Sequence, residues 1–195
     1  MNTEAAFPLL SSNYAINPTP ELDLRSNRAL LPARVIAALD LLRESVNTMS
    51  IDTSGKWWKG TEPEDLEEYL SCLSEEAYKT SEFRLARCTC ESLEFELHYN
   101  VNEEVARRKC GKCSEIHYIC GSAEYWVPGL RMKKFKCIEC RSTLANTGVG
   151  FSLYADQPGI RWLYVGERCI SCGVLGSVID WKVGLSDSFH LMEEA

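Results

Sequence analysis

The spacing of hydrophobic residues changes near residue 83, and this change divides the chain into a part with helical periodicity and a part with strand periodicity. Apolar residues recur three or four positions apart in PARVIAALDLLRESVNTM, and Pro32 suits a first helical turn, so a helix is predicted there. A second helix is predicted in TEPEDLEEYLSCLSEEAY, because Thr61 and Glu64 form a capping-box pattern. The positions of this helix that we expect to be buried are Leu66, Leu70, Leu73 and Ala77.

From residue 83 onward apolar and polar residues alternate, as they do in strands with one exposed face. In SLEFELHYNV, Phe95 and Leu97 share one face, whereas Glu96 and His98 lie on the other. The segment GVGFSLYADQPGIRWLYVGERC predicts two strands joined by a turn at 156–159, and VLGSVIDWKVG predicts a further strand. The Pro-Gly pair of VPG predicts another turn.

The composition is ordinary for a globular protein, since 45% of the 195 residues are hydrophobic and 25% are charged. No run of about 18 apolar residues occurs, so no transmembrane helix is expected. The N-terminus lacks the basic and apolar regions of a secretory signal, and we therefore expect a cytoplasmic protein whose thiols are kept reduced. Ten cysteines in such a compartment favour metal binding over disulfides.

Most of the cysteines form closely spaced pairs, while Cys72 and Cys120 stand alone. Four thiolates are a common ligand set of structural zinc, so four pairs predict two zinc ions as cofactors. Gly111 and Gly173 suit the tight turns that such pairs need. The predicted zinc ligands are Cys88, Cys90, Cys110, Cys113, Cys137, Cys140, Cys169 and Cys172.

A basic residue immediately precedes each pair, whereas neither lone cysteine follows one. A zinc ion held by four thiolates carries two formal negative charges, and a neighbouring cation offsets them. The cations that we expect beside the zinc sites are Arg87, Lys109, Lys136 and Arg168.

The cysteine pairs resemble the knuckles of zinc ribbons, in which two β-hairpins hold one ion. The resemblance covers about residues 84–182 and implies metal binding, but it is generic about function. One departure is that the segment between Cys140 and Cys169 contains a full hairpin, so the ribbon would be an elaborated one. Neighbours in sequence are the expected partners, the first two pairs forming one site and the last two the other, although crossed pairings stay open.

Together these patterns predict an α+β fold, in which N-terminal helices pack on a β-rich region built around two four-cysteine, zinc-ribbon-like sites. Residues 1–30, which are rich in Pro, Asn and Ser, are interpreted as an extended arm. Residues 31–82 are interpreted as a helical region, and residues 83–195 as a β-rich double zinc-binding region that forms one compact unit with the helices.

Two alternatives use the segment RKCGKCSEIHYIC differently. The first is a compact site made of Cys110, Cys113, His117 and Cys120. It would leave Cys88 and Cys90 without a partner pair. If EIHYI is a strand that continues to Cys120, His117 and Cys120 would point to opposite faces. The second is a redox dithiol, but CGKC lacks the preceding strand and following helix of thioredoxin-like motifs.

No catalytic pattern accompanies the cysteines. Closed four-cysteine sites leave no open coordination position for water or substrate. HExxH, GxSxG, Walker A and GxGxxG patterns are absent from the sequence. His190 follows Ser186 and Asp187, and a terminal turn explains this grouping. We therefore expect a protein that is not an enzyme.

Two binding functions fit the charge distribution. The net charge is −7, which favours a zinc-stabilised protein-binding module whose acidic helices or arm engage a basic partner, as an inhibitor or immunity-type protein would. The alternative is a nucleic-acid-binding zinc ribbon that uses the basic segment 105–141, with Tyr118, Tyr125 and Trp126 stacking on bases. Its candidate contacts are Arg107, Arg108, Lys112, Arg131, Lys133 and Lys134.

The basic segment has nine basic and three acidic residues. Charge compensation at two zinc sites would account for most of this excess, and an acidic net charge opposes nucleic-acid binding. Another protein is therefore the favoured partner, nucleic acid is less favoured, and no membrane partner is expected.

Overall fold

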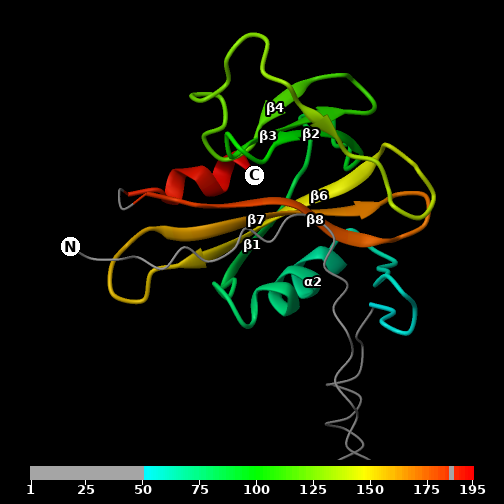
Figure 1. The fold of residues 1–195 in the computed structure, drawn as a ribbon, viewed down its shortest axis with the longest axis horizontal. Helices are drawn as coiled ribbons and strands as arrows, with labels where there is room; N and C mark the ends of the chain where they lie inside the picture. The colour runs from blue at the N-terminus through cyan, green and yellow to red at the C-terminus, as the bar shows by residue number, and fades with distance from the viewer. Residues whose placement is uncertain (1–50, 185–186) are drawn as a thin grey trace, which may run out of the picture.

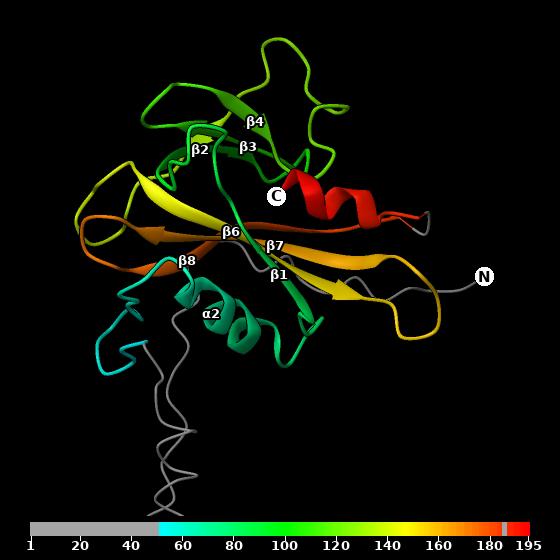
Figure 2. The same cartoon turned by 180° about the vertical axis from the view of Figure 1, so that it is seen from behind.

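The computed structural model describes residues 51–184 and 187–195. Within these residues, antiparallel strands form an eight-stranded sheet, which Figures 1 and 2 show from two sides. The strands are β1 (Glu82–Leu85), β2 (Phe95–Asn100), β3 (Val105–Cys110), β4 (Ile116–Tyr118), β5 (Lys133–Lys134), β6 (Ala145–Leu153), β7 (Ile160–Cys169) and β8 (Leu175–Lys182). A helix, α2 (Asp65–Ser74), and a 3-10 helix, η2 (Phe189–Glu194), complete the regular structure of this part.

The strands follow the order β4-β3-β2-β6-β7-β8, with β1 beside β6 and β5 beside β2. The predicted strands are present as β2, the β6–β7 hairpin and β8. Within β2, Phe95 and Leu97 are buried while Glu96 and His98 are only half-buried, which confirms the predicted faces. The predicted turn at 127–129 is closed by a hydrogen bond from the Leu130 N–H to the Val127 carbonyl.

Strands β6, β7 and β8 lie between two layers (Figures 1 and 2). On one side α2 packs through Leu66 and Leu70 against Tyr164 and Leu175 of these strands. On the other side lies the part of the sheet formed by β2 to β5, and buried residues from both parts meet in one core. This core includes Leu97, Phe135, Val149, Phe151, Leu163 and Val165.

Helix α2 approaches the sheet closely because two glycines face it. A Cβ atom at Gly166 would lie 3.0 Å from Leu70 Cδ1, and one at Gly150 would lie 3.3 Å from the same atom. The absence of side chains at these two positions lets Leu70 lie directly on the backbone of the sheet, where it is fully buried.

The predicted second helix is correct in type but wrong in its ends. The helix begins at Asp65, and no side chain caps it. Instead of the expected capping box, the Asp65 carboxylate accepts the N–H groups of Thr61 and Glu62 at 2.6 and 2.9 Å, which turns the chain before the helix. The helix ends at Ser74, so Ala77 lies beyond it and is exposed rather than buried.

The predicted arm at 1–30 and the predicted helix in PARVIAALDLLRESVNTM lie outside the described residues. Of the helical region expected over 31–82, the described part is helical only in α2. Residues 51–60 form a loop that is closed by a pair of hydrogen bonds between Asp52 and Lys59. Two N-terminal helices are therefore not supported, and the described fold is a sheet with one short α-helix.

Two parts of the chain repeat one arrangement of strands and cysteine pairs; we call them the first half (82–118) and the second half (133–182). Each half runs strand, cysteine pair, strand, strand, cysteine pair, strand. The central hairpins begin with equivalent pairings, Phe95 with Cys110 and Ala145 with Cys169. The hairpin of the second half, β6–β7, is longer than that of the first half. It is the full hairpin that was expected between Cys140 and Cys169.

The first strand of each half pairs with the other half. Leu85 of β1 lies opposite Gly148, and Lys134 of β5 lies opposite His98, at equivalent positions. The hydrogen bonds that follow are also equivalent and each measures 2.9 Å: one joins the Ala86 N–H to Thr147, the other the Phe135 N–H to Leu97. The halves are thus related by an approximate twofold axis, with their first strands exchanged.

Candidate metal centres

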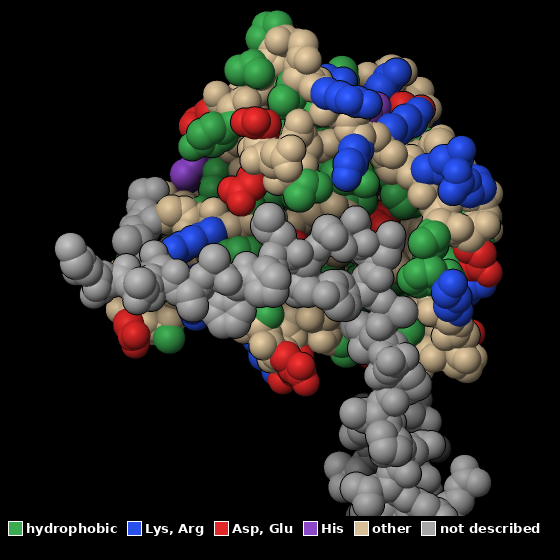
Figure 3. Space-filling model, viewed as in Figure 1, with side chains coloured by type: hydrophobic (Ala, Val, Ile, Leu, Met, Phe, Trp, Pro, Cys, Tyr) green, Lys and Arg blue, Asp and Glu red, His purple; other side chains and the backbone are tan. Residues whose placement is uncertain are grey.

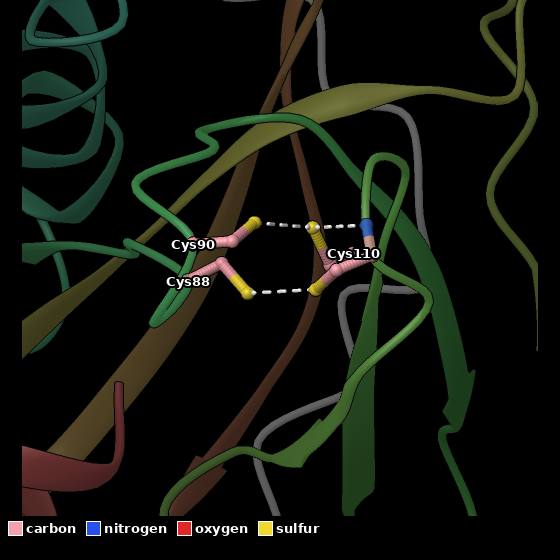
Figure 4. A group of neighbouring side chains, drawn as sticks. Cys88, Cys90 and Cys110 are labelled. Atoms are coloured by element: carbon pink, nitrogen blue, oxygen red, sulfur yellow. Dashed lines mark hydrogen bonds between the residues drawn. The ribbon is translucent and has the colours of Figure 1, made fainter.

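The first cysteine cluster consists of Cys88, Cys90, Cys110 and Cys113. Cys88 and Cys90 lie in the loop between β1 and β2, Cys110 is the last residue of β3, and Cys113 lies in the turn between β3 and β4. Figure 4 shows the side chains of Cys88 and Cys90 pointing across to Cys110. The Sγ atoms of Cys88 and Cys113 are 3.5 Å apart, and those of Cys90 and Cys110 are 3.6 Å apart.

The second cysteine cluster consists of Cys137, Cys140, Cys169 and Cys172. It repeats the first, because one pair lies in the loop between β5 and β6, and the other runs from the last residue of β7 into the turn before β8. The closest Sγ–Sγ distances are 3.6 Å for Cys137 with Cys172 and 3.4 Å for Cys140 with Cys169. Pairs adjacent in sequence therefore share a cluster, and crossed pairings do not occur.

These sulfur–sulfur distances are close to those of a tetrahedral metal site. A zinc–sulfur bond of about 2.3 Å places two ligands of one ion about 3.8 Å apart, whereas a disulfide bond measures about 2.05 Å. All ten cysteines are free thiols. Each cluster has an arrangement that can hold one metal ion through four sulfurs.

The same backbone hydrogen bonds shape all four cysteine pairs. The N–H of the residue after each pair donates to the carbonyl of the first cysteine, at 2.9 to 3.1 Å. The N–H of the first cysteine donates to the carbonyl of the second residue after the pair, at 2.8 to 3.0 Å. Each pair is therefore a closed knuckle.

The residue after each pair has a positive φ. These residues are Glu91 (67°), Ser114 (65°), Arg141 (66°) and Gly173 (73°). Gly173 is also needed for space, since a Cβ there would lie 2.5 Å from the Gly60 carbonyl oxygen. The predicted role of Gly173 agrees with this geometry, whereas Gly111 has no positive φ and the left-handed position of its knuckle belongs to Ser114.

One thiol of each cluster ionises more readily than an ordinary cysteine. Burial disfavours the Cys110 thiolate, but the N–H groups of Cys113 and Lys112 and the neighbouring thiols lower its pKa to about 6. In the second cluster the Ser142 N–H lowers the pKa of Cys140 to about 7. Contact with Cys88 and burial raise the pKa of Cys113 to about 12, even though the Glu115 N–H favours its thiolate. Thiols this close ionise together only when a cation lies among them.

Two cations that the sequence reasoning missed lie near the clusters. Arg108 is buried, and the thiols of Cys88 and Cys110 stabilise its charge against the effect of burial. Lys59 forms an ion pair of 2.9 Å with Glu139 inside the second cluster's knuckle, and this contact and the nearby Cys172 thiol raise its pKa. Neither residue precedes a cysteine pair, so no local sequence signal identifies them.

The cations that precede the pairs have other contacts. Arg87 forms an ion pair of 3.3 Å with Glu91. Arg168 donates to the carbonyls of Gly60 and Thr61 and to the Asn146 side chain, which ties the 51–61 loop to the second cluster. Lys136 is exposed and Lys109 is half-buried. That these four residues offset the negative charge of the metal-bound clusters stays a prediction.

The two lone cysteines lie outside both clusters. Cys72 is exposed on α2. Cys120 is buried, and its thiol donates to the Leu191 carbonyl at 3.3 Å. The compact alternative site therefore does not form, because Cys120 is tied to η2, whereas His117 lies against Cys88 with its Nε2 atom 3.7 Å from the Sγ atom.

The candidate nucleic-acid contacts differ in their exposure. Arg108 is buried and donates to the Ala195 carbonyl at 2.6 Å, so it is not available to a nucleic acid, and that prediction is wrong. Arg107 stacks on Trp126, with its guanidinium carbon 4.5 Å from the ring centroid. The exposed members of the set are Lys112, Arg131, Lys133 and Lys134.

The chain matches no known protein-family model, no curated protein and no solved structure. Among the described residues, no helix is both long and apolar enough to cross a membrane.

Proposed function

We propose that this chain is a non-enzymatic binding module whose fold is stabilised by two zinc ions, one in each cluster, and which engages a basic protein. The observation that carries the zinc assignment is the convergence of eight thiols from four separate segments into two groups of four sulfurs. Zinc accepts tetrahedral all-sulfur coordination and undergoes no redox change of its own. Four protein ligands per ion leave no position for a reacting water.

The place of the clusters in the fold supports a structural role. Each cluster joins the loop after an exchanged strand, β1 or β5, to the turn of a hairpin in its own half. An ion there fixes the loop that follows the exchanged strand and so stabilises the contact between the halves. Binding of metal to such a site contributes to the free energy of folding, because the unfolded chain has no preformed site.

The basic partner is proposed from an acidic groove between α2 and β1. This groove has a volume of about 490 Å³, and no Lys or Arg is among the described residues that line it. Its lining also includes an apolar floor, to which the half-buried Phe83 contributes. The acidic lining residues are Glu64, Asp65, Glu67, Glu68 and Glu82.

The acidic charges of this groove are crowded. Burial and the neighbouring Asp65 carboxylate raise the pKa of Glu68. A Lys or Arg side chain in the groove would relieve this repulsion, while its aliphatic part contacts the apolar floor. In Figure 3 the Lys and Arg side chains gather instead at the top of the view, where β2 to β4 lie in Figure 1. A basic partner is therefore steered to the α2 side, as suits an inhibitor or immunity-type protein.

Reversing two charges of the groove is expected to weaken partner binding by at least about tenfold, which corresponds to about 1.4 kcal/mol. The variant is Glu67→Lys with Glu68→Lys, and the matched control is Glu103→Lys with Glu124→Lys, which makes the same change in net charge on exposed residues elsewhere. Each immobilised protein is incubated with nuclease-treated lysate at about 0.15 M salt, and retained proteins are identified. Proteins of positive net charge should bind the wild type and the control but not the groove variant.

Equal retention by wild type, groove variant and control would contradict the groove assignment. If partners were retained from untreated lysate but none from nuclease-treated lysate, nucleic acid would be favoured instead.

The nucleic-acid function has one specific observation in its favour. Tyr118 and Trp126 contact each other at 5.0 Å between ring centroids, and Arg107 of β3 stacks on Trp126. The exposed lysines of β5 lie on the other side of β2, where Lys134 pairs with His98, the residue opposite Arg107. Aromatic and basic side chains of this kind bind single-stranded nucleic acid. Tight binding of single-stranded RNA or DNA at about 0.15 M salt, lost in the variant Lys133→Glu with Lys134→Glu, would place this function first.

A further inference from the structure

We infer that the first cluster has a second, adjacent metal position formed by Cys88, Glu115 and His117, in which the Cys88 sulfur bridges two ions. The ion would be divalent and of intermediate softness, such as zinc. This position goes beyond the two structural ions, and it rests on the proposal that zinc fills the first cluster.

The three donor atoms form a nearly equilateral triangle. His117 Nε2 lies 3.7 Å from Cys88 Sγ, and Glu115 Oε2 lies 3.6 Å from the same sulfur. The remaining side, between His117 Nε2 and Glu115 Oε2, is also 3.6 Å. Zinc with bonds of about 2.0–2.3 Å in tetrahedral geometry separates two ligand atoms by about 3.3–3.8 Å. The triangle therefore matches one face of a tetrahedron around a zinc ion.

The donors are held in place by contacts with the rest of the first cluster. Thr89 donates its hydroxyl to Glu115 Oε2 at 2.5 Å, which orients the carboxylate. The Glu115 carbonyl accepts the N–H of Cys110, so Glu115 is fixed by the knuckle itself. His117 is held in β4 opposite Arg108 of β3. The Glu115 side chain is 43% exposed, so water can supply the fourth ligand.

The charges at the first cluster favour a second cation. Four thiolates around one divalent ion carry two formal negative charges, and the Glu115 carboxylate adds a third. Arg108 is the buried cation near Cys88 and Cys110, and it offsets one of them. A second divalent ion would neutralise the remainder, and a thiolate sulfur has enough lone pairs to bridge two ions.

The second cluster shows that the knuckle fold does not itself require these donors. Val174 occupies the position equivalent to Glu115, since its carbonyl accepts the N–H of Cys169 at 2.8 Å as Glu115 does for Cys110. Gly176, two residues later, is equivalent to His117. The carboxylate and the imidazole are thus present in one half only, and the additional position is confined to the first cluster.

The test is a zinc titration of the full chain that first retains its tightly bound ions after a wash with a mild chelator. Calorimetry should record one additional ion per wild-type chain. His117→Ala and Glu115→Gln should each lower the affinity for this ion by more than about 100-fold, a larger loss than an outer hydrogen-bond partner usually causes. The exposed residues His190 and Glu124 provide matched controls, His190→Ala and Glu124→Gln, which should bind it as the wild type does.

X-ray absorption provides the second readout, because the additional ion should add nitrogen and oxygen ligands at about 2.0–2.1 Å to a sulfur-only shell at about 2.3 Å. No additional ion in the wild type, equal loss in the control variants, or loss of a tightly bound ion in His117→Ala would each overturn the inference. A wild-type chain that holds fewer than two ions after the chelator wash would instead show failure of the two-zinc proposal.

Discussion

Replacing Cys110 by serine is expected to release one metal ion and to lower the free energy of unfolding by about 3 kcal/mol or more. Cys110 is buried in the first cluster and has the pKa lowered to about 6, so its loss removes the sulfur that ionises most readily there. The second cluster has its own four sulfurs and should keep its ion. Metal content and urea unfolding of the purified variant measure the two effects.

Two further substitutions serve as comparisons for Cys110→Ser. Cys169→Ser should release the other ion and keep the one in the first cluster. Cys120→Ser should keep both ions and cost only about 1–3 kcal/mol, because Cys120 is buried outside the clusters. If Cys120→Ser released metal while Cys110→Ser did not, or if one ligand variant released both ions, the two-cluster account would be wrong.

Replacing Leu70 by alanine is expected to lower the free energy of unfolding by about 2–5 kcal/mol without loss of metal. Leu70 is fully buried against the glycines of β6 and β7, so its truncation leaves a cavity against the backbone of the sheet. Urea unfolding measures the stability and elemental analysis the metal. Leu73→Ala, on the same helix but only half-buried, should cost less. A loss below about 1 kcal/mol for Leu70→Ala would contradict this packing.

Local patterns predicted the strands and the grouping of the cysteines. Alternation placed β2, whose side chains differ in burial from one face to the other, whereas the turn at 156–159 marked the hairpin of β6 and β7, in which β6 is buried on both faces. The partners in each cluster followed from proximity in sequence, because each pair lies at the end of a strand whose hairpin neighbour carries the next pair.

The exchange of first strands between the halves has no local signal. β5 has only two residues, Lys133 and Lys134. Both are exposed, so the segment shows no alternation of buried and exposed residues that would identify a strand. Its pairing with β2 depends on how the whole second half is positioned relative to the first half. The capping box failed for a related reason, since Asp65 accepts the Thr61 N–H that the pattern assigned to the Glu64 side chain.

The charges near the clusters could not be found by counting along the sequence either. Arg108 appears in a basic run and so suggests an exposed surface, yet its position in β3 directs it into the interior beside Cys88. Lys59 is separated from Glu139 by 80 residues, and only the folded chain brings them together. His117 was considered with Cys120, but in the fold it lies beside Cys88.

The central claim, that each cluster holds one zinc ion, is tested most directly by native mass spectrometry of the full chain. The protein is purified under reducing conditions without added metal and washed with a mild chelator. The account predicts a mass increase corresponding to two zinc ions per chain, and both ions should be lost when the protein is acidified, since their thiolate ligands become protonated. One ion or fewer per chain, or iron in place of zinc, would contradict it.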